Sequence, residues 1–413
     1  MIVAGQLLLD ESNRDGTGMC RIEPGFIRID DSHIVDVQVG DIPKTAELGD
    51  AQTLVSPGMI DAHLHFPQFD MIGAHGMPLL DWLSGVTFPE EMRWADEDYA
   101  KAMSRRVINQ LLSFGTTGIC AYATVHHQSA RAALQIADEI GLRGAIGQVL
   151  MDRNAPEELC RDRNQLLDEA ATLCDEFPAH SNMASAVTPR FAISCTEPLL
   201  EGAGRLASQS GAIVQTHLAE TVNECQVVSE LFDGRDYVDV YESAGLLGNR
   251  SVFGHGIHLG PRDRAKLKQA GATIAHCPTA NSFLRSGTMD REQLTSDTVS
   301  IAIGSDIGAG YERSMVRVAR AMIEAAALIG NGFPDAGTAW HTITAGNADH
   351  LRLSDVGRLR IGHRADIVLS RPDIPWLERN QNPLATLMFA WDDRWIQNVL
   401  LRGRSVYQPT SRM

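Results

Sequence analysis

SPGMIDAHLHFPQ, residues 56–68, is an apolar segment that ends in two histidines. Because the side chains of a β-strand alternate between its two faces, His63 and His65 point to the same side. Such a pair is half of a metal site, although two alternating histidines alone are more often polar surface residues. Here Pro57-Gly58 lead into the strand, and three later strand ends each offer a further ligand. The sequence therefore predicts a metal-binding strand.

The composition is that of an ordinary globular protein. The 413 residues are 44% hydrophobic and 21% charged, which is enough apolar material for one large α/β barrel with an accessory unit. The net charge is −16. This charge argues against nucleic acids and membranes as partners, because both require a basic surface on the protein. We expect a small-molecule partner instead.

The cysteines and the N-terminus indicate a cellular compartment. The seven cysteines are scattered and form no C-x-x-C pair, a pattern that favours reduced thiols over disulfides or a zinc ribbon. The first residues lack a basic leader followed by a long apolar core, and no apolar run reaches about 18 residues. The sequence predicts a cytoplasmic protein.

The two ends of the chain have matching patterns. IVAGQLLLD and FIRIDDSHIVDVQV near the N-terminus, and ADIVLSR and IQNVLLRGRSVY near the C-terminus, are typical of short strands. We predict that residues 1–56 and 358–413 together form a small β-sandwich domain. The alternative is two independent β-edges attached to the main domain.

Residues 57–357 alternate apolar strands with helix-length segments, the pattern of parallel βα units. The eight candidate strands are MIDAHLH, TTGICAY, RGAIGQVLM, ASAVTPRF, AIVQTHL, SVFGHGI, ATIAHC and VSIAIGSD. The fold class is therefore α/β, a (βα)8 TIM-type barrel. A doubly wound open sheet is the competing fold, but the G-x-G-x-x-G turn after the first strand is missing. In a barrel the chemistry lies at the carboxyl ends of the strands.

Further metal-binding side chains follow three later strands. The fifth strand ends in QTHLAE with His217, the sixth in FGHGIHL with His255, and the eighth in AIGSDIGAG with Asp306. Imidazole nitrogens and a carboxylate oxygen suit a borderline divalent metal such as zinc, and ferrous iron also fits. The predicted ligands are His63, His65, His217 and Asp306.

Glu220 and His255 are candidates for the catalytic work. Glu220 stands three residues after His217, where it can take the proton of a metal-bound water and pass it to a substrate. An isolated glutamate would more often cap a helix or form a salt bridge, but a neighbouring ligand reverses that preference. His255 is either a further ligand or a donor that holds the water or the developing alkoxide. His258 is assigned to the surface or to a supporting role.

These motifs resemble those of a known family. PGMIDAHLH, QTHLAE, FGHGIHL, AHCPTAN and GSDIG resemble the amidohydrolase superfamily. HFPQFDMIGAHGMPLLDWLSGVTFPEE, GQVLMDRNAPEEL, TPRFAISC and LMFAWDDRWIQNVLLRGR resemble, more narrowly, the guanine deaminases. Together the motifs span nearly the whole chain, and the second group is far more specific than the first.

The resemblance implies an activity and a cofactor. It implies a homodimeric hydrolase of purine catabolism that converts guanine to xanthine and ammonia, with one Zn²⁺ per chain, or Fe²⁺ in its place. Glu220 would be the proton shuttle, assisted by His255 and Asp306. The implied substrate contacts are Phe66, Pro67, Gln68, Arg190, Phe191 and Glu220.

Two of these contacts have a physical rationale. An arginine fork presents two donors that match the six-oxo group and the neighbouring imidazole nitrogen of guanine, as it does in DNA recognition. Without the TPRF context, Arg190 would be a salt bridge at a strand end. Phe191 can stack on the purine, and Trp82 is assigned to the core.

Departures from the family pattern keep alternatives open. They occur at Gly118 and at Gly147-Gln148, away from the proposed ligands, and His126 and His127 have no assigned role. Pocket edges determine the substrate, so a deaminase of a related aminopurine, 8-oxoguanine, a pterin or a triazine remains an alternative. A two-metal amide hydrolase is disfavoured because no lysine stands near the fourth or fifth strand end. A non-catalytic relative would tend to lose ligands, and here the set is complete.

Overall fold

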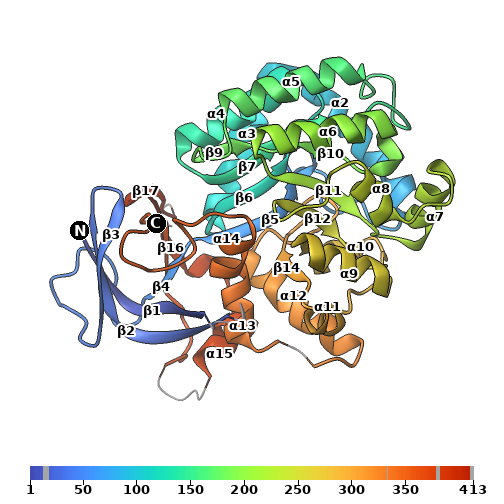
Figure 1. Ribbon diagram of the computed structural model, residues 1–413. Helices are drawn as coiled ribbons and strands as arrows, with labels where there is room; N and C mark the ends of the chain where they lie inside the picture. The colour runs from blue at the N-terminus through green and yellow to red at the C-terminus, as the bar shows by residue number, and fades with distance from the viewer. Residues whose placement is uncertain (13–17, 333, 378–381, 410–413) are drawn as a thin grey trace.

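Strand β5, Met59–His65, is the first strand of a barrel that occupies the larger lobe of the molecule (Figure 1). The computed structural model describes residues 1–12, 18–332, 334–377 and 382–409. Eight successive parallel strands form two four-stranded sheets, β5 to β9 and β11 to β14. The further strands are β6 (Thr116–Tyr122), β7 (Arg143–Gly147), β9 (Met183–Ser185), β11 (Val214–Leu218), β12 (Ser251–His255), β13 (Thr273–His276) and β14 (Ser300–Ile303).

Backbone contacts join the two sheets into a closed barrel. On one side Val187 forms a parallel bridge with Val214. On the other side the backbone N–H of Asp306 donates to the carbonyl oxygen of His63 at 2.8 Å. The short strands β8 (Val149–Leu150) and β10 (Thr188–Pro189) pair with each other and extend the third and fourth barrel strands. The predicted TIM-type barrel is confirmed.

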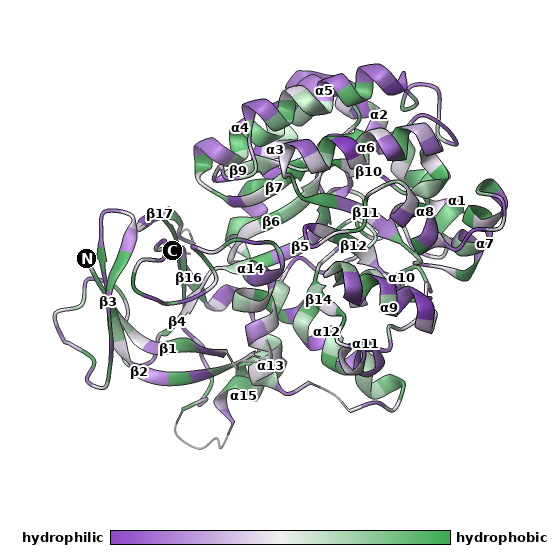
Figure 2. Ribbon diagram, viewed as in Figure 1, coloured by the Kyte–Doolittle hydropathy of each residue, from purple (hydrophilic) through white to green (hydrophobic). Residues whose placement is uncertain are grey.

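Helices surround the barrel, and several of them carry both hydrophilic and hydrophobic residues (Figure 2). In α3, for example, Val107 and Leu111 are buried four residues apart, which is the spacing of one helical face. Gly141 ends α4 in the left-handed conformation, with φ of 99°. The helices that follow the first barrel strands are α3 (Glu97–Ser113), α4 (His127–Ile140), α5 (Arg163–Glu176) and α6 (Glu197–Ser210).

The second half of the barrel is covered by more helices, most of them shorter. Two helices, α7 and α8, stand between β11 and β12, and two more, α10 and α11, stand between β13 and β14. These elements are α7 (Val222–Leu231), α8 (Tyr237–Ser243), α9 (Pro261–Ala270), α10 (Pro278–Phe283), α11 (Arg291–Ser296) and α12 (Met315–Leu328). After α12, α13 (Ala336–His341), the π-helical η5 (Thr342–Gly346), α14 (Asn347–His350) and α15 (Pro383–Ala390) lead to the smaller lobe.

The segment between β5 and α3 is the longest addition to the barrel. It consists of short helical pieces that the sequence analysis did not assign. They are η1 (Phe66–Gln68), α1 (Leu79–Trp82), the π-helical η2 (Leu83–Thr87), α2 (Phe88–Met92) and η3 (Arg93–Ala95). Because this segment leaves β5 at its carboxyl end, it brings side chains to the end of the barrel where chemistry occurs.

The two ends of the chain meet in one seven-stranded sheet, as predicted. The strand order is β17-β16-β15-β4-β1-β2-β3. Strand β4 pairs with β1 in parallel and with β15 in antiparallel orientation, which joins the N- and C-terminal segments directly and excludes two independent edges. The strands are β1 (Ile2–Ser12), β2 (Gly18–Asp30), β3 (His33–Val39), β4 (Leu54–Pro57), β15 (Ile367–Ser370), β16 (Ile396–Leu401) and β17 (Arg404–Tyr407).

One apolar cluster holds this sheet together. Side chains from six of its strands contribute to the cluster, together with Leu359 from the segment before β15. Leu8 and Leu54 instead join the core that the sheet shares with the barrel. The exact division at residues 56/57 and 357/358 stays a prediction.

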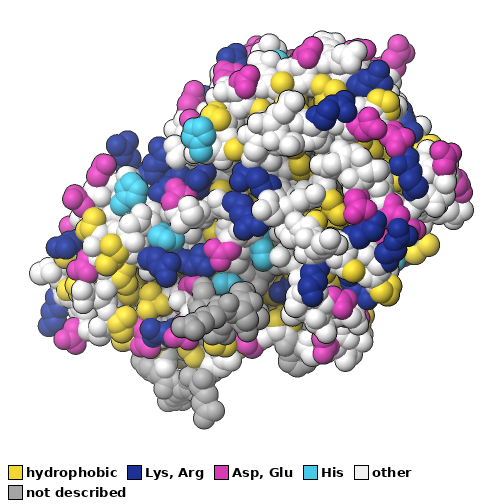
Figure 3. Space-filling model, in the orientation of Figure 1, with side chains coloured by type: hydrophobic (Ala, Val, Ile, Leu, Met, Phe, Trp, Pro, Cys, Tyr) yellow, Lys and Arg dark blue, Asp and Glu magenta, His cyan; other side chains and the backbone are white. Residues whose placement is uncertain are grey.

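The surface is polar and mixed in charge. The face in Figure 3 carries Lys and Arg as well as Asp and Glu side chains, spread over both lobes. Within the described residues, no helix is both long enough and apolar enough to cross a membrane.

Candidate active site

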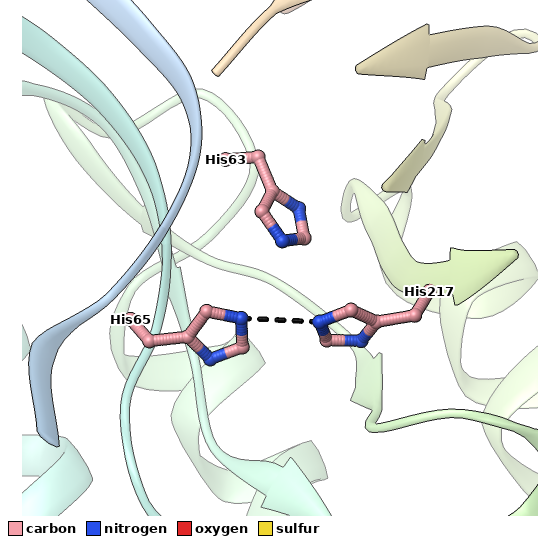
Figure 4. A group of neighbouring side chains, drawn as sticks. All are labelled: His63, His65 and His217. Carbon is pink, nitrogen blue, oxygen red and sulfur yellow. Dashed lines mark hydrogen bonds between the residues drawn. The ribbon is translucent and has the colours of Figure 1, made fainter. Parts of the chain in front are cut away.

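Three histidines from two barrel strands converge at the carboxyl end of the barrel (Figure 4). His63 and His65 come from β5 and His217 from β11, and the Nε2 atoms of His65 and His217 lie 3.1 Å apart. Asp306 follows β14, and its Oδ1 is 3.5 Å from Nε2 of both His63 and His65. The four side chains predicted as ligands therefore face one point, although they are far apart in the sequence.

Glycines make room for the central histidine. A Cβ on Gly254 would lie 2.6 Å from Cε1 of His63, and one on Gly304 would lie 2.6 Å from its Cβ. Both glycines belong to the neighbouring strand ends. His255 and Asp306 adopt positive φ angles of 71° and 48°, a conformation that costs free energy for non-glycine residues and is concentrated at functional sites. The backbone conformation at these strand ends thus leaves space for His63 and orients His255 and Asp306.

Burial keeps the three histidines neutral. His63 and His65 are 1% and 2% exposed, and His217 is partly buried. Burial lowers the pKa of His63, His65 and His217 well below its ordinary value, and the neighbouring charged groups lower it further. Burial also raises the pKa of Asp306 to about 6. A metal needs histidines in this neutral state, because only an unprotonated nitrogen can coordinate it.

The arrangement fits a divalent metal ion. His63, His65 and His217 form one group whose ligand atoms all lie within 4.8 Å of one another, and His63, His255 and Asp306 form a second. Nε2 of His63 is fully buried and has no hydrogen-bond partner in the described structure, whereas buried polar atoms normally have one. Three nitrogens and a carboxylate oxygen are a typical donor set for zinc.

Hydrogen bonds from behind fix the orientation of two histidines. The carbonyl oxygen of Arg190 accepts from Nδ1 of His217 at 2.6 Å, and the Oδ1 of Asn281 accepts from Nδ1 of His255 at 2.9 Å. In each ring Nε2 then faces the site. Such supports are typical of metal-binding and catalytic histidines.

Glu220 lies beside this cluster in a position to move protons. Its Oε2 is 3.3 Å from Nε2 of His255, and its Oε1 accepts a hydrogen bond from Oγ of Ser286 at 2.7 Å. Burial raises the pKa of Glu220 to about 8, and the charge of Asp306 contributes to the increase. A pKa near neutrality is suited to a group that both takes and gives a proton. His258 supports this contact, since its Nε2 lies 2.8 Å from the carbonyl oxygen of Ser286.

A cavity opens above the cluster. Its polar lining includes Gln68, Arg190 and Glu220, and its apolar lining includes Phe191 and Trp82. The mixture of an apolar wall with a few polar groups is typical of a small-molecule site. Also in the lining are His65, Leu79, Leu83, His217, Glu224, His255, Leu284, Asp306 and Ala309.

Some predicted contacts lie elsewhere. Phe66 and Pro67 are buried in η1 and are not part of the cavity lining, because the 3₁₀ turn places Phe66 in the core. Trp82, which the sequence assigns to the core, is 2% exposed and packs in an apolar cluster, but it also borders the cavity. His126 and His127 stand at the start of α4, outside the lining.

The departures from the family pattern also lie outside the cavity. Gln148 donates to the carbonyl oxygen of Val125 and to Glu169, and its Oε1 is 3.1 Å from Nδ1 of His127. Gly118 lies against Ile60, where a Cβ would be 2.9 Å from Cγ1 of that residue. Neither position contributes to the lining of the cavity.

The sequence analysis missed two buried glutamates. Glu224 caps α7 and lines the cavity, and its place in a T-x-x-E capping box after Glu220 was a readable signal. Glu91, in α2, bonds to Arg190 across 99 residues of sequence. No local pattern indicates a partner at such a distance.

Comparison with known proteins gives a consistent result. Residues 54–406 match the model of the Amidohydrolase family. The chain is 35% identical to the guanine deaminase of Escherichia coli strain K12 over 379 residues, which are 89% of this chain and 86% of that protein. The solved structure of E. coli guanine deaminase superposes with a TM-score of 0.93 at 31% identity, covering 99% of this chain and 100% of that one.

A second solved structure contains a ligand. Guanine deaminase from C. acetobutylicum with guanine bound in its active site superposes with a TM-score of 0.91 at 27% identity. The match covers 98% of this chain and 99% of that one.

Proposed function

Because the chain belongs to the amidohydrolase family, we propose that its cluster of histidines and carboxylates carries out the hydrolytic deamination of guanine to xanthine and ammonia. The chain is a metal-dependent hydrolytic enzyme, and its substrate is a small purine. One observation carries the assignment to this site. Glu220, His255 and three of the four proposed ligands (His65, His217 and Asp306) line a single cavity with Arg190, whose fork matches the oxo edge of guanine.

The proposed metal is one Zn²⁺ per chain, with Fe²⁺ as the alternative. His63, His65, His217 and Asp306 would hold it. When bound, such an ion lowers the pKa of a water ligand from about 15.7 toward 7, so that hydroxide is available at neutral pH. The neutral imidazoles and the unpartnered Nε2 of His63 support this choice.

The residues around the ion would then move the protons. Glu220 takes a proton from the water, whose oxygen bonds to C2 of guanine, and delivers that proton to the neighbouring ring nitrogen. His255, through Nε2, and Asp306 hold the attacking oxygen. The hydroxyl proton of the tetrahedral adduct moves to the exocyclic amine, the C2–N bond breaks and ammonia leaves. One water is consumed, and xanthine and one ammonia are formed.

The substrate contacts are proposed from the lining of the cavity. Arg190 would donate to O6 and N7 of guanine, Gln68 would bond to another edge, and Phe191 would pack on the ring face. These side chains lie in the same cavity as Glu220. Phe66 and Pro67 would act through the turn that positions Gln68 rather than by direct contact.

The decisive test uses the purified, zinc-loaded protein and guanine. The ultraviolet spectrum should convert from that of guanine to that of xanthine while one equivalent of ammonia is released, and a chelator should abolish both changes. The panel should include 8-oxoguanine, a pterin, adenine and a triazine as competing substrates. Release of ammonia from one of these and not from guanine would overturn the substrate assignment.

We also propose a cytoplasmic homodimer. All seven cysteines are free, as is usual in a reducing compartment, and the homodimer follows from the resemblance to guanine deaminases. Light scattering coupled to gel filtration should give a mass of twice the 45.0 kDa chain. A monomeric mass would contradict the proposal.

A further inference from the structure

A buried glutamate lies behind the arginine of the cavity. Glu91 in α2 is 1% exposed and Arg190 is 2% exposed. Nη1 of Arg190 donates to both carboxylate oxygens of Glu91, at 2.5 and 2.7 Å. The described residues offer no further hydrogen bond to the guanidinium, and Arg190 lines the cavity. One end of the fork is therefore committed to Glu91, and the remaining donors are left for a ligand.

The same carboxylate also contacts the second polar residue of the cavity wall. Nε2 of Gln68 donates to Oε1 of Glu91 at 3.5 Å, which is a long hydrogen bond. Oε1 of Gln68 is fully buried and has no partner in the described structure. Because a carboxylate can only accept, the amide must turn its NH₂ group toward Glu91. Its oxygen is then available to a donor in the cavity.

We propose that Glu91 is a positioning residue that sets the hydrogen-bond polarity of the substrate cavity. By accepting from Arg190 and Gln68 together, it leaves the remaining donors of Arg190 and the side-chain oxygen of Gln68 for a substrate. The cavity then favours a purine that presents hydrogen-bond acceptors to Arg190 and a donor to Gln68. This inference rests on the proposed function, because it takes guanine as the substrate.

The ion pair also fixes the charge of the cavity wall. A buried guanidinium without a partner would carry a large desolvation cost, and the carboxylate at 2.5 Å compensates its charge. Phe88, one helical turn before the end of α2, has its ring centroid 5.5 Å from Cζ of Arg190 and restricts the fork further. The fork is thus held in one plane before a substrate arrives.

Two purines distinguish positioning from a general structural role. Guanine presents the acceptors O6 and N7 to the fork. In 2,6-diaminopurine an amino donor replaces O6, while the reacting amino group at C2 is unchanged. Hydrolysis at C2 consumes one water and releases one ammonia from either purine. Only guanine can accept from both donors of a correctly held fork, because 2,6-diaminopurine keeps the N7 acceptor alone.

The experiment compares Glu91→Gln, Glu91→Asp and the control Glu90→Gln. Glu90 is the neighbouring, partly exposed residue, which pairs with Arg93 at 2.7 Å and not with Arg190. For guanine, kcat/KM of Glu91→Gln should fall by about 10- to 100-fold, the value of one good bidentate contact. For 2,6-diaminopurine it should change by less than about threefold on the same measure. Glu91→Asp should recover part of the loss, and Glu90→Gln should match the wild type.

A binding measurement separates this inference from the proposed function. In the Glu220→Gln background, quenching of tryptophan fluorescence reports occupancy, since Trp82 borders the cavity. Adding Glu91→Gln should lower the preference for guanine over 2,6-diaminopurine by the same factor. An equal loss for both purines, an unchanged preference, or no binding of guanine to the parent would overturn the inference. If the wild type does not turn guanine over but its binding preference for guanine over 2,6-diaminopurine still depends on Glu91, only the proposed function would be overturned.

Discussion

The side chain of Glu220 is held in one position by its neighbours. It is 2% exposed and lies between His255 and Ser286, which hold its two oxygens at 3.3 and 2.7 Å. A glutamine at this position would keep the volume and one acceptor but would lose the ability to take a proton. The residue therefore offers a test of acid–base catalysis that leaves the cavity intact.

We expect Glu220→Gln to retain one metal per chain and to lose turnover by about 10²-fold or more, the usual contribution of general acid–base catalysis. Steady-state kinetics and elemental analysis measure the two quantities. Glu230→Gln, at an exposed position of α7, is the control. Near-normal turnover of Glu220→Gln would remove Glu220 from the mechanism.

Gly254, next to His255, is predicted to be as important for metal binding as a ligand is. An alanine at position 254 would place its Cβ 2.6 Å from the ring of His63, and the packed strands leave the ring no space to retreat. We expect Gly254→Ala to weaken metal binding by about 10- to 100-fold, the range found for residues that support ligands. Competition with a chromogenic chelator would measure the affinity.

Gly248→Ala is the matched control, because the nearest atom to its Cβ would be 3.9 Å away. It should bind metal like the wild type. If Gly254→Ala also binds metal normally, the close packing around His63 does not determine its position.

At the scale of single residues, the sequence predicted the atoms that converge and not the contacts that support them. His63 and His65 followed from strand alternation, and His217 and Asp306 from their places at strand ends. Glu91 could not be predicted, because its partner Arg190 is 99 residues away and only the closed barrel brings them together. Phe66 was named as a substrate contact on the family resemblance alone, and the 3₁₀ turn that places it in the core was not foreseen.

Among the elements, α7 connects stability to the site. Its N-cap, Thr221, accepts from the backbone N–H of Glu224 at 3.0 Å, and the Glu224 carboxylate accepts from the N–H groups of Glu220 and Thr221 at 2.7 and 3.2 Å. Tyr237 in α8 donates to the same carboxylate at 2.8 Å. The cap thus holds the backbone of the proposed proton shuttle.

Loss of this cap should have a measurable cost. We expect Thr221→Ala to lower the free energy of unfolding by about 1 kcal/mol, the usual value of an N-cap side chain. Denaturant unfolding of the zinc-loaded protein would measure it. Thr172→Ala, at an exposed position inside α5, should be neutral or slightly stabilising, because alanine is the better helix former. Equal values for the two variants would contradict a capping role.

The elements themselves were largely predictable from pattern. Helices α3 to α6 lie in the predicted helix-length segments between the strands, and each of the eight predicted strands overlaps a strand of the barrel. The interruptions were not predictable. The third strand breaks at Gln148 into β7 and β8, and the fourth breaks at residues 186–187 into β9 and β10.

For the molecule as a whole, we expect the free energy of unfolding to fall in acid, and one buried histidine contributes to this loss. His276 is 1% exposed, and neither ring nitrogen has a hydrogen-bond partner in the described structure. Burial, with the charge of Arg291, lowers the pKa of His276 to about 3. The unfolded chain protonates this group near 6.5, so between these values the unfolded state binds one more proton than the folded state.

The sign follows from this difference. The stabilisation that comes from neutral, buried His276 is fully present above about pH 6.5. As the pH falls toward 3, the free energy of unfolding decreases by about 1.4 kcal/mol per pH unit. We expect His276→Asn to be less stable at pH 7 but to have a shallower decline in unfolding free energy between pH 6 and pH 4. Denaturant unfolding at a series of pH values would measure the slope. Parallel curves would show that His276 does not titrate in this range.

The overall architecture also has a consequence for synthesis. One edge of strand β4 cannot form its hydrogen bonds until β15, its neighbour in the sheet, has been synthesised. Strand β15 begins only at Ile367. During translation the N-terminal strands leave the ribosome first and spend most of the elongation time with β4 exposed as an unpaired edge, a surface prone to aggregation. The nascent chain must therefore be sheltered until its last segment arrives, and a circular permutant that makes both terminal segments consecutively would be released from that dependence.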